Sequence, residues 1–380
     1  MITCPELSHE QEVLLRATLG HGHVAIDAWR EWQQRFDLAT LDANGYALLP
    51  QLYLRLRQLD VPQASLAKLR GIYRHTWCQN QVVMTRMAGA LSLLEERGIR
   101  SLLLDGAAIM ATRPSGLLPL EKFEFLVPGI RFADATAVFR REGWAQHADS
   151  EGQRLAHAIS FSHSDGTMCA IYRSVLSEST PSWADDDCWR HAVASAIQDL
   201  PVSVLSPTDQ VLRLLVEVGM GCHPFTPRWV ADIWTLLTDA DGSMDWERLR
   251  AKCATLHLTL PVKRSLAMLQ ALSVFRWPSE LLDVAATMGT TWAERREDEQ
   301  RLRGPAQKRG VASAVAEHWC QYKRVVGEPG RIAGFPRYLR ETWKLPSVWL
   351  LPVTAMGKWR QLVGTKKGRT VKWRVRSGIE

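Results

Sequence analysis

Two short apolar runs, separated by a glycine turn and a predicted short helix, constrain the fold of this chain more than any other feature of its sequence. The first run, Ile99–Leu104, has the length and composition of a buried strand, and Gly106 then supplies a turn before a helix of small residues. The second run, Leu117–Gly129, again has the character of a buried strand. Two strands that flank one short helix predict a small α/β core.

The second run is interrupted by charged residues. Because successive side chains of a strand point to opposite faces, Lys122 and Glu124 share one face, while Phe123 and Phe125 share the other. Charged groups in an apolar strand cost free energy unless they are paired, hydrated or used in a site. Three interpretations therefore stay open: an internal ion pair, a hydrated edge of the sheet, or a functional site.

Helical periodicity dominates on both sides of this core. Apolar residues recur at three- and four-residue intervals before Gly98 and again after Leu205. Within the core, the stretch "HAISFSHSDGTMCAIYRSV" predicts two alternating strands joined by a turn at Asp165 and Gly166. We therefore predict an α+β fold, in which a small mixed β-sheet core is flanked by N-terminal and C-terminal helical blocks.

The boundaries of these parts follow from local signals. Gly98 is a helix stop, and Ser206, followed by Pro207 and Asp209, is a helix start. We predict four parts: an N-terminal helical block (1–98), an α/β core (99–205), a C-terminal helical block (206–330) and a Trp-containing basic tail (331–380).

Composition bounds the class of protein. The 380 residues are 46% hydrophobic and 23% charged, which is ordinary for a globular protein, and no apolar run is long enough to span a membrane. The N-terminal segment lacks the pattern of a secretory signal, so we expect a cytoplasmic protein. Seven scattered cysteines have no metal-ligand spacing and are expected to be reduced thiols.

The net charge of +7 is concentrated at the C-terminus. Eight basic residues and one acid lie between Lys358 and Glu380, whereas the preceding 357 residues hold 39 basic and 39 acidic groups. Tryptophans are interleaved with these basic residues, a pattern that suits the anionic inner surface of a membrane. A solvated tail and a tail that binds a protein or peptide partner stay open, and a nucleic-acid partner is disfavoured. The oligomeric state is left undetermined.

The order of strand, glycine turn, helix and charged strand resembles the polymerase-β-type nucleotidyltransferases. More specifically, the chain resembles a bacterial family of uncharacterised nucleotidyltransferases within that superfamily. The stretches that carry the resemblance are "EERGIRSLLLDGAAIMA", "LLPLEKFEFLVPG", "LSPTDQVLRLLVEVG", "RWVADIWTLL" and "DWERLRAKCATLHL". They occur in the order and at the spacing of the family.

The resemblance implies a nucleotide site and a metal site. The turn at Gly106 and Ala107 would hold the phosphates of a nucleotide through backbone N–H groups. Acids on neighbouring strands would bind two Mg²⁺ ions. The family has Lys-Gly in the turn where this chain has Asp105 followed by Gly106.

Two further departures concern the acids themselves. The family has Asp-x-Asp on the second strand, where this chain has Lys122, Phe123 and Glu124. The third strand offers Ala170 and Tyr172 where the family offers an acid. Two of the three expected acidic ligands are thus replaced. We interpret Lys122 and Glu124, together with Asp105, as the remnant of a metal-binding face converted into a salt-bridged pair.

Two functions remain open on this basis. The first is a catalytically degenerate protein that acts as a binding or scaffolding module and needs no cofactor. The alternative is an active transferase that uses Mg²⁺ and NTP to modify a small molecule or peptide, with Glu124 as metal ligand and with Asp105 and Glu121 completing a rearranged site. Arg228 and Asp232, four residues apart on a predicted helix, either pair structurally or belong to the cleft.

Overall fold

The computed structural model describes residues 7–62, 66–112, 118–147, 158–176, 182–238, 244–272, 275, 277–302, 319, 322, 334–342 and 347–351. Residues 1–151 and 156–300 form one compact unit, and residues 152–155 and 301–380 form a second. The finer division of the first unit into two helical blocks and a core stays a prediction.

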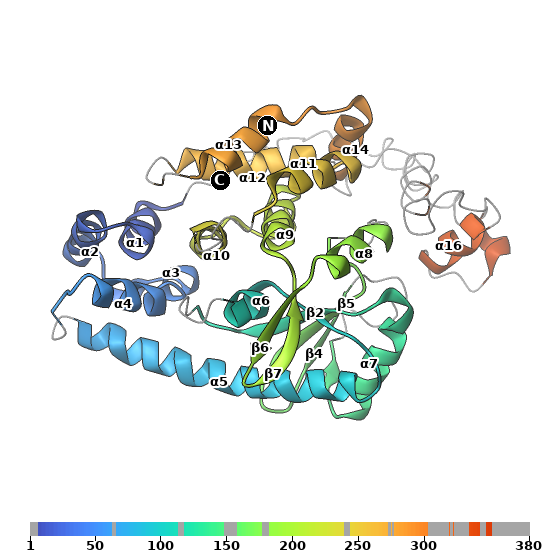
Figure 1. Ribbon diagram of the computed structural model, residues 1–380, viewed down its shortest axis with the longest axis horizontal. Coiled ribbons are helices and arrows are strands. Elements are labelled where there is room, and N and C mark those ends of the chain that lie inside the picture. The colour runs from blue at the N-terminus through green and yellow to red at the C-terminus, as the bar shows by residue number, and fades with distance from the viewer. Residues whose placement is uncertain are drawn as a thin grey trace, which may run out of the picture. The chain divides into compact units, whose positions relative to one another are not determined.

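The N-terminal part is helical, as its periodicity predicts. Its helices are α1 (His9–Leu19), α2 (His23–Arg35), α3 (Ala43–Tyr46), α4 (Leu49–Gln58) and α5 (Ala67–Glu95), with the 3-10 helix η1 (Leu38–Thr40) between α2 and α3. Helix α5 is 29 residues long and passes under both the N-terminal helices and the sheet (Figure 1). It ends just before Gly98, which has a φ of +63°, so glycine provides the predicted stop.

The core is a mixed sheet of seven strands in the described residues. The strands are β1 (Leu102–Leu104), β2 (Lys122–Leu126), β3 (Ala145–Gln146), β4 (Ala158–Ser162), β5 (Met168–Tyr172), β6 (Val193–Ile197) and β7 (Leu200–Val204), in the order β3-β4-β5-β2-β1-β7-β6. The predicted hairpin is present as the antiparallel pair β4–β5, and β1 lies antiparallel to β2. The hairpin β6–β7 and its place beside β1 were not predicted from the sequence.

The two faces of this sheet differ in chemistry. One face, which carries Phe123 and Phe125, packs on α5 and on α7 (Phe132–Arg141). The other face carries Leu104, Glu124 and Tyr172. The alternation predicted for β2 is therefore confirmed, and the face with Glu124 turns toward α8 (Ser182–Arg190) and α9 (Pro207–Gly219).

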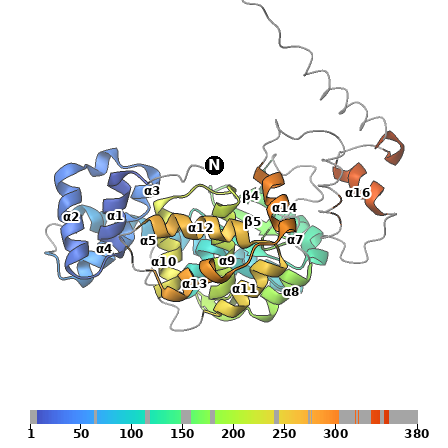
Figure 2. The same cartoon turned by 90° about the horizontal axis from the view of Figure 1, so that it is seen from above.

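The C-terminal helices close the compact unit. They are α9, α10 (Pro227–Thr238), α11 (Trp246–Thr255), α12 (Thr259–Ala271), α13 (Ser279–Thr287) and α14 (Trp292–Leu302). Helix α9 starts as predicted, because Ser206 accepts a hydrogen bond from the Asp209 backbone N–H. Helices α9 to α13 share one hydrophobic core with α1, α2 and α4 (Figure 2). The two helical blocks thus stabilise each other directly.

Little of the C-terminal tail is described. Helix α16 (Phe335–Thr342) and the 3-10 helix η7 (Val348–Leu350) belong to it, whereas residues 352–380, which include all eight basic residues, lie outside the described residues. Its attachment to an anionic surface or to a partner stays a prediction. No helix in the described part of the chain is long and apolar enough to cross a membrane.

Candidate functional site

The site predicted from the sequence begins where β1 passes into α6 (Asp105–Thr112). Asp105 is the first residue of α6 and has a φ of +49°, a left-handed conformation that Asp adopts more readily than most residues. Its neighbour Leu104 pairs with Glu124 across the antiparallel β1–β2 ladder. The turn therefore places the Asp105 carboxylate beside the Glu124 carboxyl group, with which it interacts.

The predicted ion pair on β2 is present. Lys122 Nζ lies 2.7 Å from Glu124 Oε1, and Tyr172 donates its hydroxyl to the same oxygen at 2.9 Å. The Glu124 side chain is only 8% exposed, whereas the Lys122 side chain is 45% exposed. Glu124 is thus held from two sides, by Lys122 and by Tyr172.

A residue that the sequence did not single out dominates the site. Arg213, on α9, is 2% exposed and donates from Nε and Nη2 to the two oxygens of Asp105, each at 2.9 Å. It also contacts Glu217 at 2.9 Å and donates to the backbone oxygen of Val175. Its guanidinium lies 4.7 Å from the ring centroid of Tyr172. A bidentate, buried guanidinium occupies the place where a metal ion would need free oxygen ligands.

We call this group the cleft cluster; its members are Asp105, Lys122, Glu124, Arg213 and Glu217. Its acids are not equivalent. Burial disfavours the ionised form of Asp105, but the guanidinium of Arg213 outweighs burial and holds its pKa at about 2. Burial and the neighbouring Asp105 carboxylate raise the pKa of Glu124, and burial raises the pKa of Glu217 to about 8 despite Arg213. Two cations thus face three acids, and of the three only Asp105 has a lowered pKa.

The strand beside β2 offers no carboxylate. In the parallel β2–β5 pair, Glu124 lies opposite Ala170, and Leu126 lies opposite Tyr172. Ala170 is buried, and its methyl group lies on the face where the family resemblance places a third metal ligand. In the described part of the chain, no group of three or more His, Cys, Asp or Glu side chains could hold a metal ion. The residues present therefore do not fit a two-metal centre.

The predicted phosphate-binding turn is covered. The cavity next to Gly106 has a volume of about 10 Å³ and is lined by α6, by Leu118–Leu120 and by Arg228 with Asp232. A Cβ atom on Gly106 would lie 3.5 Å from Arg228 Nη2, so the guanidinium sits directly over the turn. Ala107 is buried in the sheet core. A space of this size holds one water molecule at most.

The structure brings Arg228 and Asp232 next to this turn. Arg228 Nε lies 3.7 Å from Asp232 Oδ2, and Arg228 Nη1 lies 4.0 Å from Glu121 Oε1. Burial raises the pKa of Asp232 to about 6, and Arg228 only partly offsets that effect. Glu121 is 81% exposed and contacts Arg228, so in this structure it does not join Glu124 and Asp105.

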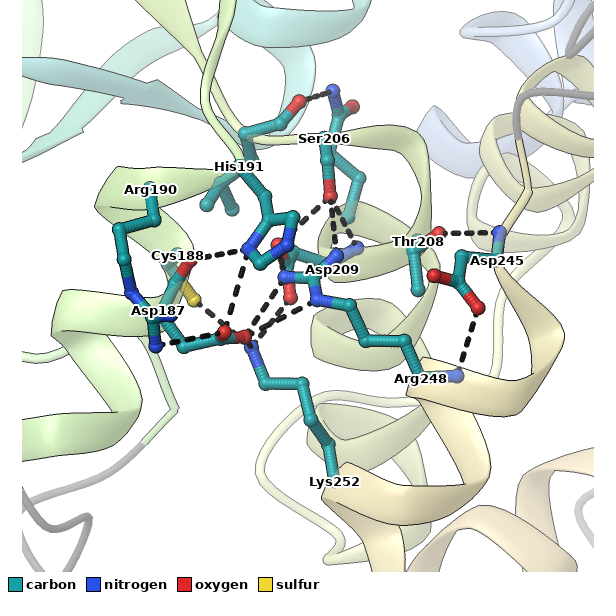
Figure 3. A network of polar contacts seen from close by, with 12 residues as sticks. Asp187, Cys188, Arg190, His191, Ser206, Thr208, Asp209, Asp245, Arg248 and Lys252 are labelled. Atoms are coloured by element: carbon teal, nitrogen blue, oxygen red, sulfur yellow. Dashed lines mark hydrogen bonds and ion pairs between the residues drawn. The ribbon is translucent and has the colours of Figure 1, made fainter.

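A second buried charge network, which the sequence also did not reveal, joins α8, α9 and α11 (Figure 3). We call it the helix network; its core is Asp187, Asp209, Arg248 and Lys252. Lys252 Nζ lies 2.7 Å from Asp209 Oδ1 and 2.9 Å from Asp187 Oδ2, and Arg248 Nη2 contacts both acids. Each acid thus contacts both cations, and these ion pairs link helices α8, α9 and α11.

Comparison with known proteins identifies a family for this chain. Residues 34–273, more than half of the chain, match the family described as uncharacterised nucleotidyltransferase. The match spans α5, the whole sheet and helices α9 to α12, and so includes the cleft cluster. Neither the curated proteins nor the solved structures gave a match. The chain therefore belongs to this family of uncharacterised nucleotidyltransferases.

Proposed function

We propose that this protein has lost metal-dependent nucleotidyl transfer and serves as a binding or scaffolding module built on the nucleotidyltransferase fold. The observation that carries the proposal is the bidentate contact of Arg213 with Asp105, at 2.9 Å for each oxygen. Two-metal transfer requires carboxylate oxygens that are free to bind hard divalent ions. Asp105 would be a ligand only in the rearranged site of an active transferase, and here a buried side-chain cation takes its oxygens.

Lys122 supports the same conclusion. Its ammonium contacts Glu124, the one acid that remains from the Asp-x-Asp position. A unit positive charge about 4 Å from a second one costs about 4 kcal/mol at an effective dielectric constant near 20, and a divalent ion roughly doubles that cost. A metal ion at Glu124 would therefore have to displace Lys122.

The covered turn argues against nucleotide binding in the observed conformation. The cavity at Gly106 is about 10 Å³, and Arg228 and Leu120 both approach the glycine. A triphosphate needs hundreds of cubic ångströms, the scale of small-molecule pockets. The alternative, an active transferase that uses Glu124, Asp105 and Glu121, would need Arg228 to swing away and Glu121 to move inward.

The test is a thermal-unfolding experiment on the full chain with each NTP in the presence and absence of Mg²⁺ or Mn²⁺, combined with an assay for transfer of labelled nucleotide. A ligand that binds the folded state raises the melting temperature by mass action. We expect no metal-dependent stabilisation and no transfer above background. Metal-dependent transfer by the wild type that Glu124→Gln abolishes without unfolding the protein would overturn the proposal.

A gain-of-function variant sharpens the same test. Lys122→Asp with Ala170→Asp and Arg213→Met restores two acids and removes the buried guanidinium, so it should gain Mn²⁺ binding, measurable by calorimetry. The matched control is Lys122→Asn with Ala170→Asn and Arg213→Met, which has the same side-chain sizes without the new charges. Equal Mn²⁺ binding by wild type and both variants would contradict the proposed role of the cations.

A further inference from the structure

Strands β1 and β7 are parallel neighbours that pair at one position. Within the described residues they share the pair Leu103–Val204 alone. Beside this pair, the Leu205 N–H donates to the Leu103 carbonyl oxygen. Because backbone groups alternate in direction along a strand, the Ser203 N–H faces the same side as that of Leu205. No hydrogen bond in the described chain joins it to the segment before β1, so the sheet opens into a gap here.

A cavity of about 490 Å³ occupies this gap. It lies between residues 98–101, which lead into β1, and residues 200–203 of β7. Its apolar wall includes Leu91, on α5, together with Leu200 and Val202, which all belong to the core between α5 and the sheet. A volume of this size is within the range of small-molecule sites in proteins.

Two charged side chains of opposite sign line this cavity. Glu95 is the last residue of α5, and Arg100 lies in the segment that leads into β1; both are exposed. Among the described residues neither has an ion-pair partner, and they do not pair with each other. Their neighbours Glu96 and Arg97, in contrast, form ion pairs on the surface. The lining of the cavity thus carries one unpaired anion and one unpaired cation.

The two charges are held on opposite sides of the sheet. The Arg100 guanidinium lies 4.4 Å from the ring centroid of Trp189, on α8, and α8 packs on the face that carries Glu124. Glu95 belongs to α5, which packs on the face that carries Phe123. The stacked ring restricts the guanidinium, so less conformational entropy is lost when it binds an anion. A ligand in the gap would meet a cation on one side and an anion on the other.

The polar groups of the lining match the termini of an amino acid or dipeptide. An ammonium group suits Glu95, and a carboxylate suits the guanidinium of Arg100, which can donate two parallel hydrogen bonds to it. The hydroxyls of Ser101 and Ser203 also line the cavity, and no hydrogen bond in the described chain uses them. A ligand with only one charge would leave the second charged side chain unpaired. The apolar wall, finally, suits an apolar side chain.

We propose that the gap between β7 and residues 98–101 binds a small zwitterion with an apolar side chain, an amino acid or a dipeptide, whose ammonium group contacts Glu95 and whose carboxylate contacts Arg100. An internal segment of a protein partner is disfavoured, because it has neither a free amino group nor a free carboxylate for these two side chains. The cavity and the cleft cluster share no residue, so the proposal does not depend on the proposed loss of catalysis.

The test is isothermal titration calorimetry of the full chain with leucine and with leucyl-leucine. We expect saturable binding of at least one of them, which is then the parent ligand. Its N-acetyl form lacks the ammonium group and its amide form lacks the carboxylate, so each should bind about tenfold more weakly. Glycine or glycyl-glycine, which keeps both charges without the apolar side chain, should also bind more weakly than the parent ligand.

Variants locate the ligand in the gap. Arg100→Gln should weaken binding of the parent ligand about tenfold but leave binding of its amide form nearly unchanged, because that form has no carboxylate for the guanidinium. Glu95→Gln should likewise weaken binding of the parent ligand but not of its N-acetyl form. The matched controls are Arg97→Gln and Glu96→Gln, which change neighbouring charges outside the cavity lining and should bind as the wild type does.

A blocking variant completes the test. Ala194→Trp places a large side chain at an exposed position of β6 that lines the cavity, and it should abolish binding. Absence of binding of both ligands in the millimolar range would overturn the proposal, as would binding that Arg100→Gln, Glu95→Gln and Ala194→Trp all leave unchanged. Equal binding of the parent ligand and its two modified forms would overturn it as well. That comparison needs only the wild type, so it decides the matter even where a variant does not fold.

Discussion

The cleft cluster and the helix network are both buried charge clusters in the same compact unit, yet they differ in balance. In the helix network two acids meet two cations, and the cations Lys252 and Arg248 hold the pKa of both acids below its usual range. In the cleft cluster three acids meet two cations, and the pKa values of Glu124 and Glu217 are raised.

The difference concerns how completely the buried charges are paired. A network that serves only to join helices gains most when every charge is paired, because an unpaired buried charge is costly. The helix network satisfies that condition. The cleft cluster has one acid more than it has cations, and the raised pKa of Glu217 lets that acid hold a proton near neutral pH. The following predictions test this contrast, from the largest expected effect to the smallest.

Arg213→Met should destabilise the protein most. It leaves Asp105 and Glu217 buried without their cation, and removal of one partner from a buried ion pair costs about 3–5 kcal/mol. Lys252→Met should cost less, about 1–3 kcal/mol, because Asp187 and Asp209 both keep Arg248. Urea unfolding of both variants measures the difference. Equal losses of stability would mean that the cleft cluster depends on a single cation no more than the helix network does.

Glu217→Gln should stabilise the protein at alkaline pH. The folded-state pKa of Glu217 is about 8, above its unfolded value, so the folded state binds the proton more tightly and the wild type loses stability as pH rises from about 4.5 to about 8. The amide removes this loss, a gain on the order of 1–3 kcal/mol. Urea midpoints compared at about pH 5 and about pH 8.5 measure it. The control Glu121→Gln changes an 81% exposed side chain and should show no such trend.

Asp187→Asn should show the opposite dependence on pH. Burial alone would raise the pKa of Asp187, but Lys252 and Arg248 lower it to about 2, so its stabilising effect is complete above the unfolded pKa near 4 and is lost as pH falls to about 2. We expect the variant to be about 1–2 kcal/mol less stable at neutral pH and to approach the wild type below about pH 3. A constant difference across that range would show that Asp187 acts through packing and not through its charge.

Arg190→Ala should have the smallest effect. Arg190 also contacts Asp187, at 3.3 Å, but its side chain is 70% exposed. Exposed ion pairs contribute about 0–1 kcal/mol because water and salt screen them. A loss of stability near the lower end of this range, measured by the same urea titration, would show that Arg190 does not belong to the helix network. A loss as large as that of Lys252→Met would show that the network includes this exposed residue.

Several features of the site could be predicted because their causes are local. Side-chain alternation along β2 placed Lys122 and Glu124 on one face, and the contact between them follows from their two-residue spacing. The start of α9 at Ser206 and the β4–β5 hairpin likewise depend on neighbouring residues. The local signals that predicted the start of α9 did not single out Arg213, which is buried.

The sequence by itself determined the α+β composition and the family to which the chain belongs, because both are encoded in residue type and short-range spacing. Only the tertiary structure decided which cation pairs with Asp105. Arg213 is 108 positions from Asp105, and an ion pair over that distance forms only when α9 packs over the sheet face that carries Glu124. The same holds for the place of β7 beside β1, since strand order is set by long-range pairing that no local pattern specifies.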